Sequence, residues 1–79
     1  MKLNSLTKKN FGKKVQVLKI LDSTFSNKLI ELGFITGQTL EVVFSAPFGD
    51  PIAIELNGSV LSLRLEEAAT IEVKCINTF

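Results

Sequence analysis

Very few residues in this chain of 79 have side chains that could carry out chemistry. Histidine is absent, so the commonest acid/base group at neutral pH and the commonest ligand of transition metals are both missing. The adjacent carboxylates of Glu66 and Glu67 would diverge in either a helix or a strand, which excludes an acid/base pair or a metal clamp there. No nucleophile with a matching base can be named, and the sequence therefore predicts a protein that is not an enzyme.

Metal binding would depend on the single cysteine, Cys75, and on carboxylates scattered along the chain. Soft ligands are too few and no two acids have a recognisable ligand spacing. We predict no metal site and no cofactor, with weak binding of Fe²⁺ or another divalent ion as the most that these residues offer. Cys75 is expected to be a small buried residue in the last strand. One cysteine cannot form an internal disulfide, which agrees with a reducing compartment.

The net charge is only +1, but the charges are unevenly distributed. Residues 1–28 contain seven lysines and one acidic residue, whereas residues 29–79 contain two basic and seven acidic residues. The lysines either form a solvated face or orient the protein toward the anionic inner membrane or nucleic acid. Nucleic acid is the weaker option, because the sequence has one arginine and no Tyr or Trp. The lysines concerned are Lys8, Lys9, Lys13, Lys14, Lys19 and Lys28.

The composition indicates one folded cytoplasmic domain over residues 1–79. Apolar residues make up 46% of the sequence, which excludes a disordered chain. The apolar runs are a few residues long, whereas a membrane helix needs about 20. The first residues carry lysines without an apolar block, so they do not form a secretory signal. The oligomeric state does not follow from the sequence.

A short helix is predicted in the first half of the chain. Residues 22–24 offer several N-cap oxygens, and Phe25, Leu29 and Leu32 follow at the spacing of one helix face. Leu29 and Leu32 are expected to pack in the core. Gly33 can take the left-handed conformation that ends a helix.

Strands are predicted on both sides of this helix. The run from residue 15 to residue 21 is rich in β-branched residues, and its alternation slips near Leu18, which suggests a bulge. After the helix, Thr36 and Gly37 predict a type II turn, because Gly37 can supply the positive φ. The strand that follows alternates with Leu40, Val42 and Phe44 on one face.

The strongest local signal is Asn57-Gly58, which predicts a two-residue hairpin turn. Its register would place the large aliphatic residues of both strands on one face. The expected cross-strand pairs are Leu56 with Ser59, Ile54 with Leu61, and Ile52 with Leu63.

The remaining segments complete the predicted fold. Residues 66–69 predict a turn or a single helical turn, and residues 71–75 alternate as a last strand. The lead-in residues Leu3, Leu6 and Phe11 are expected to pack against the core. Five short strands and one early helix indicate a mainly β fold, a small antiparallel barrel that is closed or nearly closed.

The loop from Ala46 to Pro51 is the first candidate binding site. Pro47 and Pro51 fix φ, and Gly49 lies between them. One interpretation is that this stiff loop presents Phe48 and Asp50 to a partner at little ordering cost. The other is that Phe48 covers the end of the barrel and Asp50 accepts hydrogen bonds from backbone amides of the turn.

Three further residues are candidate contacts with a partner protein. Phe25 and Phe34 flank the helix and could be partly exposed beside its apolar face. Arg64 is expected on the outer face of its strand, where it would form either a salt bridge or a contact with an acidic partner.

Three stretches, in this order, carry a resemblance to a known family. They are Leu-Ile-Glu-Leu-Gly-Phe-Ile-Thr-Gly at residues 29–37, Ala-Pro-Phe-Gly-Asp-Pro-Ile at residues 46–52, and Leu-Ser-Leu-Arg-Leu-Glu-Glu-Ala at residues 61–68. Over nearly its whole length the chain resembles the ferrous iron transport protein A (FeoA) family. One departure is Thr36, where the family usually has proline; the turn loses some preorganisation but keeps its geometry.

The resemblance implies an SH3-like barrel that works in bacterial ferrous iron uptake beside FeoB, a membrane permease with a cytosolic GTPase domain. We therefore expect a cytoplasmic protein-interaction module that acts on the cytosolic part of this permease. The alternative is a metal-responsive regulatory or metallochaperone module that binds a transition metal ion directly. The barrel is also similar to the C-terminal domain of iron-dependent repressors, but this chain has no helix-turn-helix domain.

Overall fold

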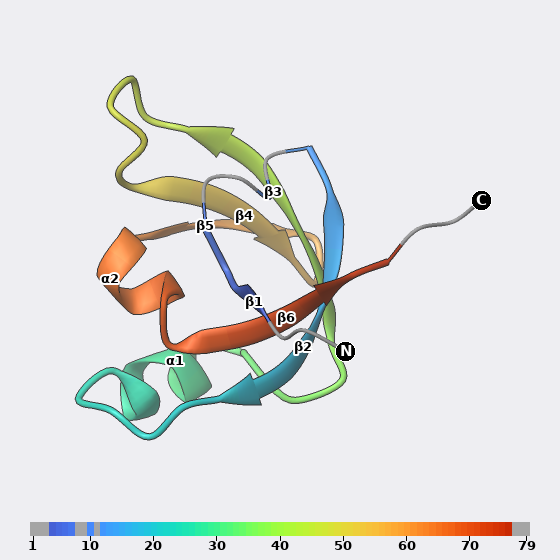
Figure 1. Cartoon of the computed structure of the whole chain (residues 1–79), viewed down its shortest axis with the longest axis vertical. Helices are drawn as coiled ribbons and strands as arrows, with labels where there is room; N and C mark the ends of the chain where they lie inside the picture. The colour runs from blue at the N-terminus through green and yellow to red at the C-terminus, as the bar shows by residue number, and fades with distance from the viewer. Residues whose placement is uncertain (1–3, 8–9, 11, 77–79) are drawn as a thin grey trace.

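Residues 4–7, 10 and 12–76 are described by the computed structural model, and they build a strongly curved antiparallel sheet with two short helices (Figure 1). One helix lies between the second and third strands, and the other lies between the last two strands. The elements are β1 Asn4–Ser5, β2 Lys14–Ile20, α1 Ser26–Leu32, β3 Thr39–Ser45, β4 Ile52–Leu56, β5 Ser59–Leu63, α2 Leu65–Ala68 and β6 Ile71–Cys75.

The strands follow the order β1-β6-β2-β3-β4-β5, and all neighbouring pairs are antiparallel. The sheet curls so that β2 and β6 face β4 and β5 across the interior (Figure 1). The mainly β barrel of about five strands, with a short helix after the first of them, is therefore confirmed. The two-residue strand β1 is an addition, and the predicted single helical turn is α2.

Strand β2 contains the irregularity that its apolar pattern predicts. Val15 and Val17 are fully buried, and the pairing of β2 with β6 shifts register between Val17 and Lys19. Leu18 lies at this shift and is partly exposed. A bulge of this kind increases the local twist and bends the strand. The predicted slip near Leu18 is therefore confirmed.

The turn before β3 has the geometry predicted for Thr36 and Gly37. Gly37 has a φ of 91°, and its N–H donates to the carbonyl oxygen of Val17 at 2.7 Å. The N–H of Gln38 donates to the carbonyl oxygen of Ile35 at 3.3 Å. Threonine in place of the family's usual proline is therefore compatible with this turn.

Strand β3 departs from the predicted alternation in its second half. Leu40 and Val42 are buried, but the register with β4 shifts between Val42 and Phe44, and Phe44 is 60% exposed. The prediction that Phe44 shares one face with Leu40 and Val42 is therefore wrong. One extra residue in β3 turns the side chains beyond it to the opposite face.

The hairpin formed by β4 and β5 has the predicted turn and register. Asn57 and Gly58 have φ values of 56° and 83°, the left-handed geometry that a two-residue type I′ turn requires. The cross-strand pairs are Leu56 with Ser59, Ile54 with Leu61, and Ile52 with Leu63, all as predicted.

Helix α1 contributes less apolar surface to the core than its spacing predicts. It begins after Phe25, which has no side-chain capping bond, although the Ser23 hydroxyl oxygen accepts the N–H of Phe25 at 3.0 Å. Leu29 is buried and Gly33 ends the helix with a φ of 107°, as predicted. Leu32, however, is 36% exposed, so its expected place in the core is wrong. Phe34, just beyond the helix, enters the core instead.

The core lies inside the curved sheet and is closed at one end by α1. The predicted lead-in contributes Leu6, which is fully buried, whereas Leu3, Lys8, Lys9 and Phe11 lie outside the described residues. The buried apolar residues are Leu6, Val15, Val17, Leu29, Phe34, Leu40, Val42, Ile52, Ile54, Leu56, Leu63, Ala68, Ile71 and Val73.

Candidate functional site

The loop between β3 and β4 is held in one shape by its own backbone. The N–H of Ala46 donates to the carbonyl oxygen of Pro51 at 3.0 Å, and the N–H of Gly49 donates to that of Ala46 at 2.7 Å. Gly49 is buried and has a φ of 86°, so the chain reverses direction at this glycine. A closed loop of this kind offers its side chains to a partner with little further loss of conformational freedom.

Phe48, at the tip of this loop, is 96% exposed. The interpretation that Phe48 covers the end of the barrel is therefore wrong. Phe44, which the bulge turns outward in the same hairpin, is 60% exposed. Exposed aromatic residues are unfavourable in water, and aromatic residues are enriched in the central parts of protein interfaces. The β3–β4 hairpin therefore carries the two most prominent exposed aromatic groups of the described residues.

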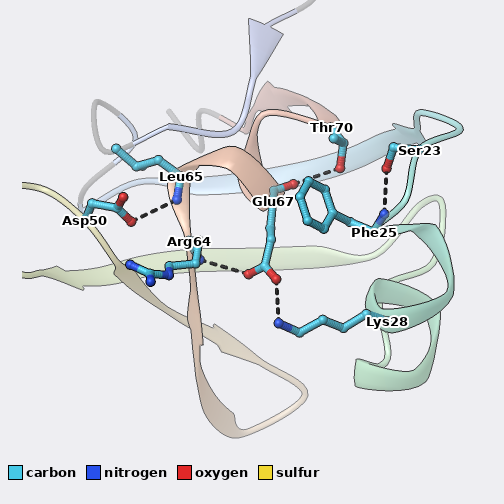
Figure 2. A network of polar contacts seen from close by, with 8 residues as sticks. All are labelled: Ser23, Phe25, Lys28, Asp50, Arg64, Leu65, Glu67 and Thr70. Atoms are coloured by element: carbon cyan, nitrogen blue, oxygen red, sulfur yellow. Dashed lines mark hydrogen bonds and ion pairs between the residues drawn. The ribbon is translucent and has the colours of Figure 1, made fainter.

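Asp50 connects this loop to helix α2. Its Oδ1 accepts the backbone N–H of Leu65, the first residue of α2, at 3.0 Å (Figure 2). A carboxylate at this position satisfies a free helical N–H and interacts favourably with the positive end of the helix. Asp50 does accept a backbone amide, as one interpretation holds, but the amide belongs to α2 and not to the turn. Asp50 therefore positions the loop that carries Phe48.

Glu67 connects α2 to helix α1 and also binds the N-terminus of α2. One carboxylate oxygen of Glu67 accepts the N–H of Arg64 at 3.0 Å, and the other forms an ion pair with Lys28 of α1 (Figure 2). The Glu67 side chain is almost fully buried, whereas that of Lys28 is about half exposed. The hydrogen bond from Lys28 lowers the pKa of Glu67; burial opposes this, and the N–H of Arg64 lowers the pKa further.

Sequence reasoning missed this structural role of Glu67. The expected divergence of the two acids is correct, since Glu66 is exposed and Glu67 is buried. The available signal was the helix start at residues 64–67, where an acid in the third helical position can accept the N–H of the N-cap. The partner Lys28, 39 residues away in the sequence, could not be found from spacing.

The other candidate contact residues do not lie together with Phe48. Phe34 has no exposed surface, so the expectation that it contacts a partner is wrong. Phe25 is partly buried against the core at the start of α1, at the opposite end of the view from the β3–β4 loop (Figure 1). Arg64 is exposed, and its guanidinium points away from Glu67 (Figure 2). Within the described residues the one ion pair joins Lys28 to Glu67, so the salt bridge considered for Arg64 is not formed there.

The residues considered for metal binding do not gather in the described part of the chain, and two of the lysines considered for membrane contact, Lys8 and Lys9, lie outside it. Cys75 is exposed, so the prediction of a buried cysteine is wrong; it occupies the last position of β6, beyond the buried pair Ile71 and Val73. In the described part of the chain, no group of three or more Cys, Asp or Glu side chains is placed to hold a metal ion. The exposed lysines Lys13 and Lys19 lie at opposite ends of β2. No described helix is long and apolar enough to cross a membrane.

A shallow depression on the outer face of the sheet has no evident chemical use. Lys14 lies opposite Glu41 in the neighbouring strand, a pair of opposite charges. Glu41 in turn lies opposite Glu55 of the next strand, a pair of like charges. Carboxylates that face each other across a sheet repel one another mildly. The depression is lined by Lys14, Thr39, Leu40, Glu41, Glu55, Asn57 and Gly58.

Comparison with known proteins places this fold among iron transport proteins. The sequence matches the FeoA domain family over residues 1–75. A fusion of Fe(2+) transport protein A with the Fe(2+) transporter FeoB from Porphyromonas gingivalis is 41% identical over 54 residues, 68% of this chain but 6% of that protein. A putative Fe(2+) transport protein A from Campylobacter jejuni is 40% identical over 50 residues, 63% of this chain and 68% of that protein.

Solved structures agree with this assignment. The NMR structure of a FeoA-like protein from Clostridium acetobutylicum superimposes with a TM-score of 0.91 at 34% identity, over 100% of this chain and 93% of that chain. The crystal structure of FeoA from Stenotrophomonas maltophilia complexed with zinc, described as an SH3 domain protein, shares the fold with a TM-score of 0.68 at 23% identity, over 89% and 91% of the chains. The chain is therefore an SH3-like domain that belongs to the FeoA family.

Proposed function

We propose that this protein is a cytoplasmic, non-enzymatic accessory of ferrous iron uptake that binds the cytosolic part of a FeoB-type permease through its β3–β4 loop. The observation that carries the proposal is the exposure of Phe48, 96%, on a loop that its own backbone bonds and Asp50 hold in place. A rigid aromatic side chain of this kind fits a pocket on a partner protein. Burial of a phenylalanine side chain contributes about 1.5–3 kcal/mol.

The fused relative supports the choice of partner. In the Porphyromonas gingivalis protein, transport protein A and the transporter FeoB are parts of one polypeptide, so the two act at the same place in that bacterium. This chain corresponds to only 6% of the fused protein, and the transport activity itself would therefore belong to the separate permease. A domain that is not fused to the permease needs a non-covalent interface in place of the covalent link. The Phe48 loop suits such an interface best, because it is rigid and exposes an aromatic side chain.

The test is calorimetric titration of the protein into the purified cytosolic domain of the permease, with and without guanine nucleotide. We expect binding without added metal, weakened at least about tenfold by Phe48→Ala, because about 1.5–3 kcal/mol of apolar burial is lost. The matched control is Ile35→Ala, which removes an apolar side chain of 58% exposure from the segment between α1 and β3, outside the β3–β4 loop. Equal weakening by both variants, or no binding at all, would contradict the proposal.

The proposal assigns no resident metal to this chain, and direct binding of a transition ion is the alternative that the same instrument can detect. The available ligand is the exposed thiol of Cys75, and a thiolate alone does not make a stable site. Heat with Fe²⁺ alone, lost in Cys75→Ser, together with no heat from the permease domain, would replace the proposed function by a metal-carrying one.

A further inference from the structure

Strand β5 forms one edge of the sheet. Within the described residues its only strand partner is β4, and β1 and β5 are the two ends of the strand order. The type I′ turn makes Leu56 and Ser59 a hydrogen-bonded pair, and such pairs alternate with non-bonded pairs along an antiparallel ladder. The backbone N–H and C=O groups of Val60 and Ser62 therefore point away from β4, to the free edge.

This edge lacks the features by which proteins usually prevent strand pairing. Its sequence Ser-Val-Leu-Ser-Leu has no charged residue and no proline, and its register with β4 is regular from the turn to Leu63. Val60 is 66% exposed and Ser62 is exposed as well. Charged residues, prolines, bulges and very short strands are the common protections of an edge. At the other end of the sheet, β1 has two residues within the described part of the chain.

We propose that β5 is a self-association surface, on which β5 of a second copy pairs in antiparallel orientation about a two-fold axis at Leu61. This axis sets Val60 opposite Ser62 of the partner subunit. The outward N–H and C=O groups of both residues then form hydrogen bonds between the two copies. Leu61 then faces its own counterpart in a non-bonded pair, with Cα atoms about 4.5 Å apart. A neutral strand meets its own copy without repulsion, and an interface of this symmetry closes as a dimer.

The charges around the edge complement this register. Arg64 has an extended backbone, with φ −66° and ψ 148°, so it continues the line of β5. Two strand spacings and two residues separate Glu55 from Arg64 of the partner subunit, a Cα distance of about 12 Å that two long side chains can span. Gly58 lies opposite that arginine, and because glycine has no side chain it does not block the approach of the arginine to Glu55. Arg64 and Glu55 are both exposed, and the symmetry forms this contact twice.

Cross-linking tests the register directly. In a Cys75→Ser background, which removes the exposed native thiol, Leu61→Cys should form an intersubunit disulfide under mild oxidation, because its Cα separation is in the required range. The matched control is Val60→Cys, whose two copies would lie about 8 Å apart, too far for a disulfide. A dimer band for Leu61→Cys and not for Val60→Cys supports the proposal. Equal cross-linking of both variants, or of neither, overturns it.

Sedimentation equilibrium tests whether the backbone carries the association. We expect the wild type to approach twice the monomer mass at about 1 mM, since so small an interface is weak. Val60→Pro, which removes an outward N–H, and Ser62→Lys should stay monomeric. Val60→Thr, which keeps the N–H but replaces an apolar group, should still associate. Association lost in Val60→Thr but kept in Val60→Pro would show apolar adhesion and overturn the proposal.

Charge exchange provides a third test, which does not depend on strand stability. Arg64→Glu should weaken the dimer, and the double variant Arg64→Glu with Glu55→Arg should restore it, because the partners are exchanged together. A wild type that is monomeric at all concentrations, with β5 variants that impair only binding to the permease domain, would assign the edge to another protein and overturn the proposal. The proposed dimer does not depend on the role of Phe48, which lies on the other hairpin.

Discussion

The two hairpins of the sheet share strand β4 but are built in opposite ways. The β4–β5 hairpin has a two-residue turn and a regular register, and its large apolar residues face inward except Val60, which is 66% exposed. The β3–β4 hairpin has a six-residue loop at positions 46–51 and a bulge, and it turns Phe44 and Phe48 into solvent. The first hairpin mainly supplies side chains to the core, whereas the second leaves two aromatic side chains exposed to solvent. This exposed apolar surface, which is costly for folding, is the surface that we propose for partner binding.

The largest expected effect tests the buried side of this comparison. Ile54→Ala removes a fully buried side chain from β4 and should lower the free energy of unfolding by about 2–5 kcal/mol. Phe44→Ala removes a larger side chain just beyond the bulge, but it should cost less than about 0.5 kcal/mol because that side chain is mostly exposed. Urea denaturation of both variants measures the difference. A larger loss for Phe44→Ala would mean that β3 has no bulge.

The next largest effect concerns α2, which joins both hairpins. Glu67→Gln keeps an acceptor for the N–H of Arg64 but removes the charge that pairs with Lys28, and it should cost about 1–3 kcal/mol at pH 7. The pKa of Glu67 is lowered from 4.5 in the folded state, so its contribution is complete above the unfolded pKa and is lost as the pH falls through the folded pKa. Denaturation at pH 7 and pH 3 should show the variant and wild type converging in acid. A constant difference would refute the ion pair.

A smaller effect distinguishes the two turns. Gly58→Val places a β-branched residue at a φ of 83° and should cost about 1–2 kcal/mol. Pro47→Ala, in the loop of the other hairpin, should cost less than about 1 kcal/mol, because it mainly increases the freedom of the unfolded chain. Thermal unfolding of the pair tests this order. If Pro47→Ala were the more damaging variant, the loop and not the tight turn would fix the position of β4.

An effect on stability smaller than that of Gly58→Val should come from Asp50. Asp50→Ala removes the acceptor for the N–H of Leu65 at an exposed helix start and should cost about 0.5–1.5 kcal/mol. The same variant should weaken permease binding, since the Phe48 loop loses its connection to α2. Asp50→Asn, which keeps an acceptor oxygen, should recover most of both losses. Binding unaffected by Asp50→Ala would show that the loop backbone alone positions Phe48.

Local signals were sufficient for the parts of the fold that are fixed by turn chemistry and period. Asn57-Gly58 predicted both turn and register, Gly33 predicted the end of α1, and the slip near Leu18 predicted a bulge. Each of these depends on residues close in sequence. Phe44 could not be placed in this way, because its outward direction depends on how β3 pairs with β4.

The candidate site was only partly predictable for the same reason. The rigid loop and its residues Phe48 and Asp50 could be named from prolines and glycine, but the acceptance of the Leu65 N–H depends on where α2 lies. Phe34 was expected to be partly exposed, because its burial depends on how the segment after α1 packs against the sheet, which the sequence does not show. Cys75 follows the alternation of its strand, yet it is exposed at the last position of β6.

The bond between Lys28 and Glu67 also has a consequence in time. It joins the segment between β2 and β3 to the segment between β5 and β6, across 39 residues, and closing so long a segment costs conformational entropy, so we expect this bond to form late in folding. An interaction absent from the folding transition state slows unfolding and leaves the folding rate unchanged. Loss of the Glu67 side chain would then raise the unfolding rate, and so shorten the lifetime of the native state, without lowering the folding rate.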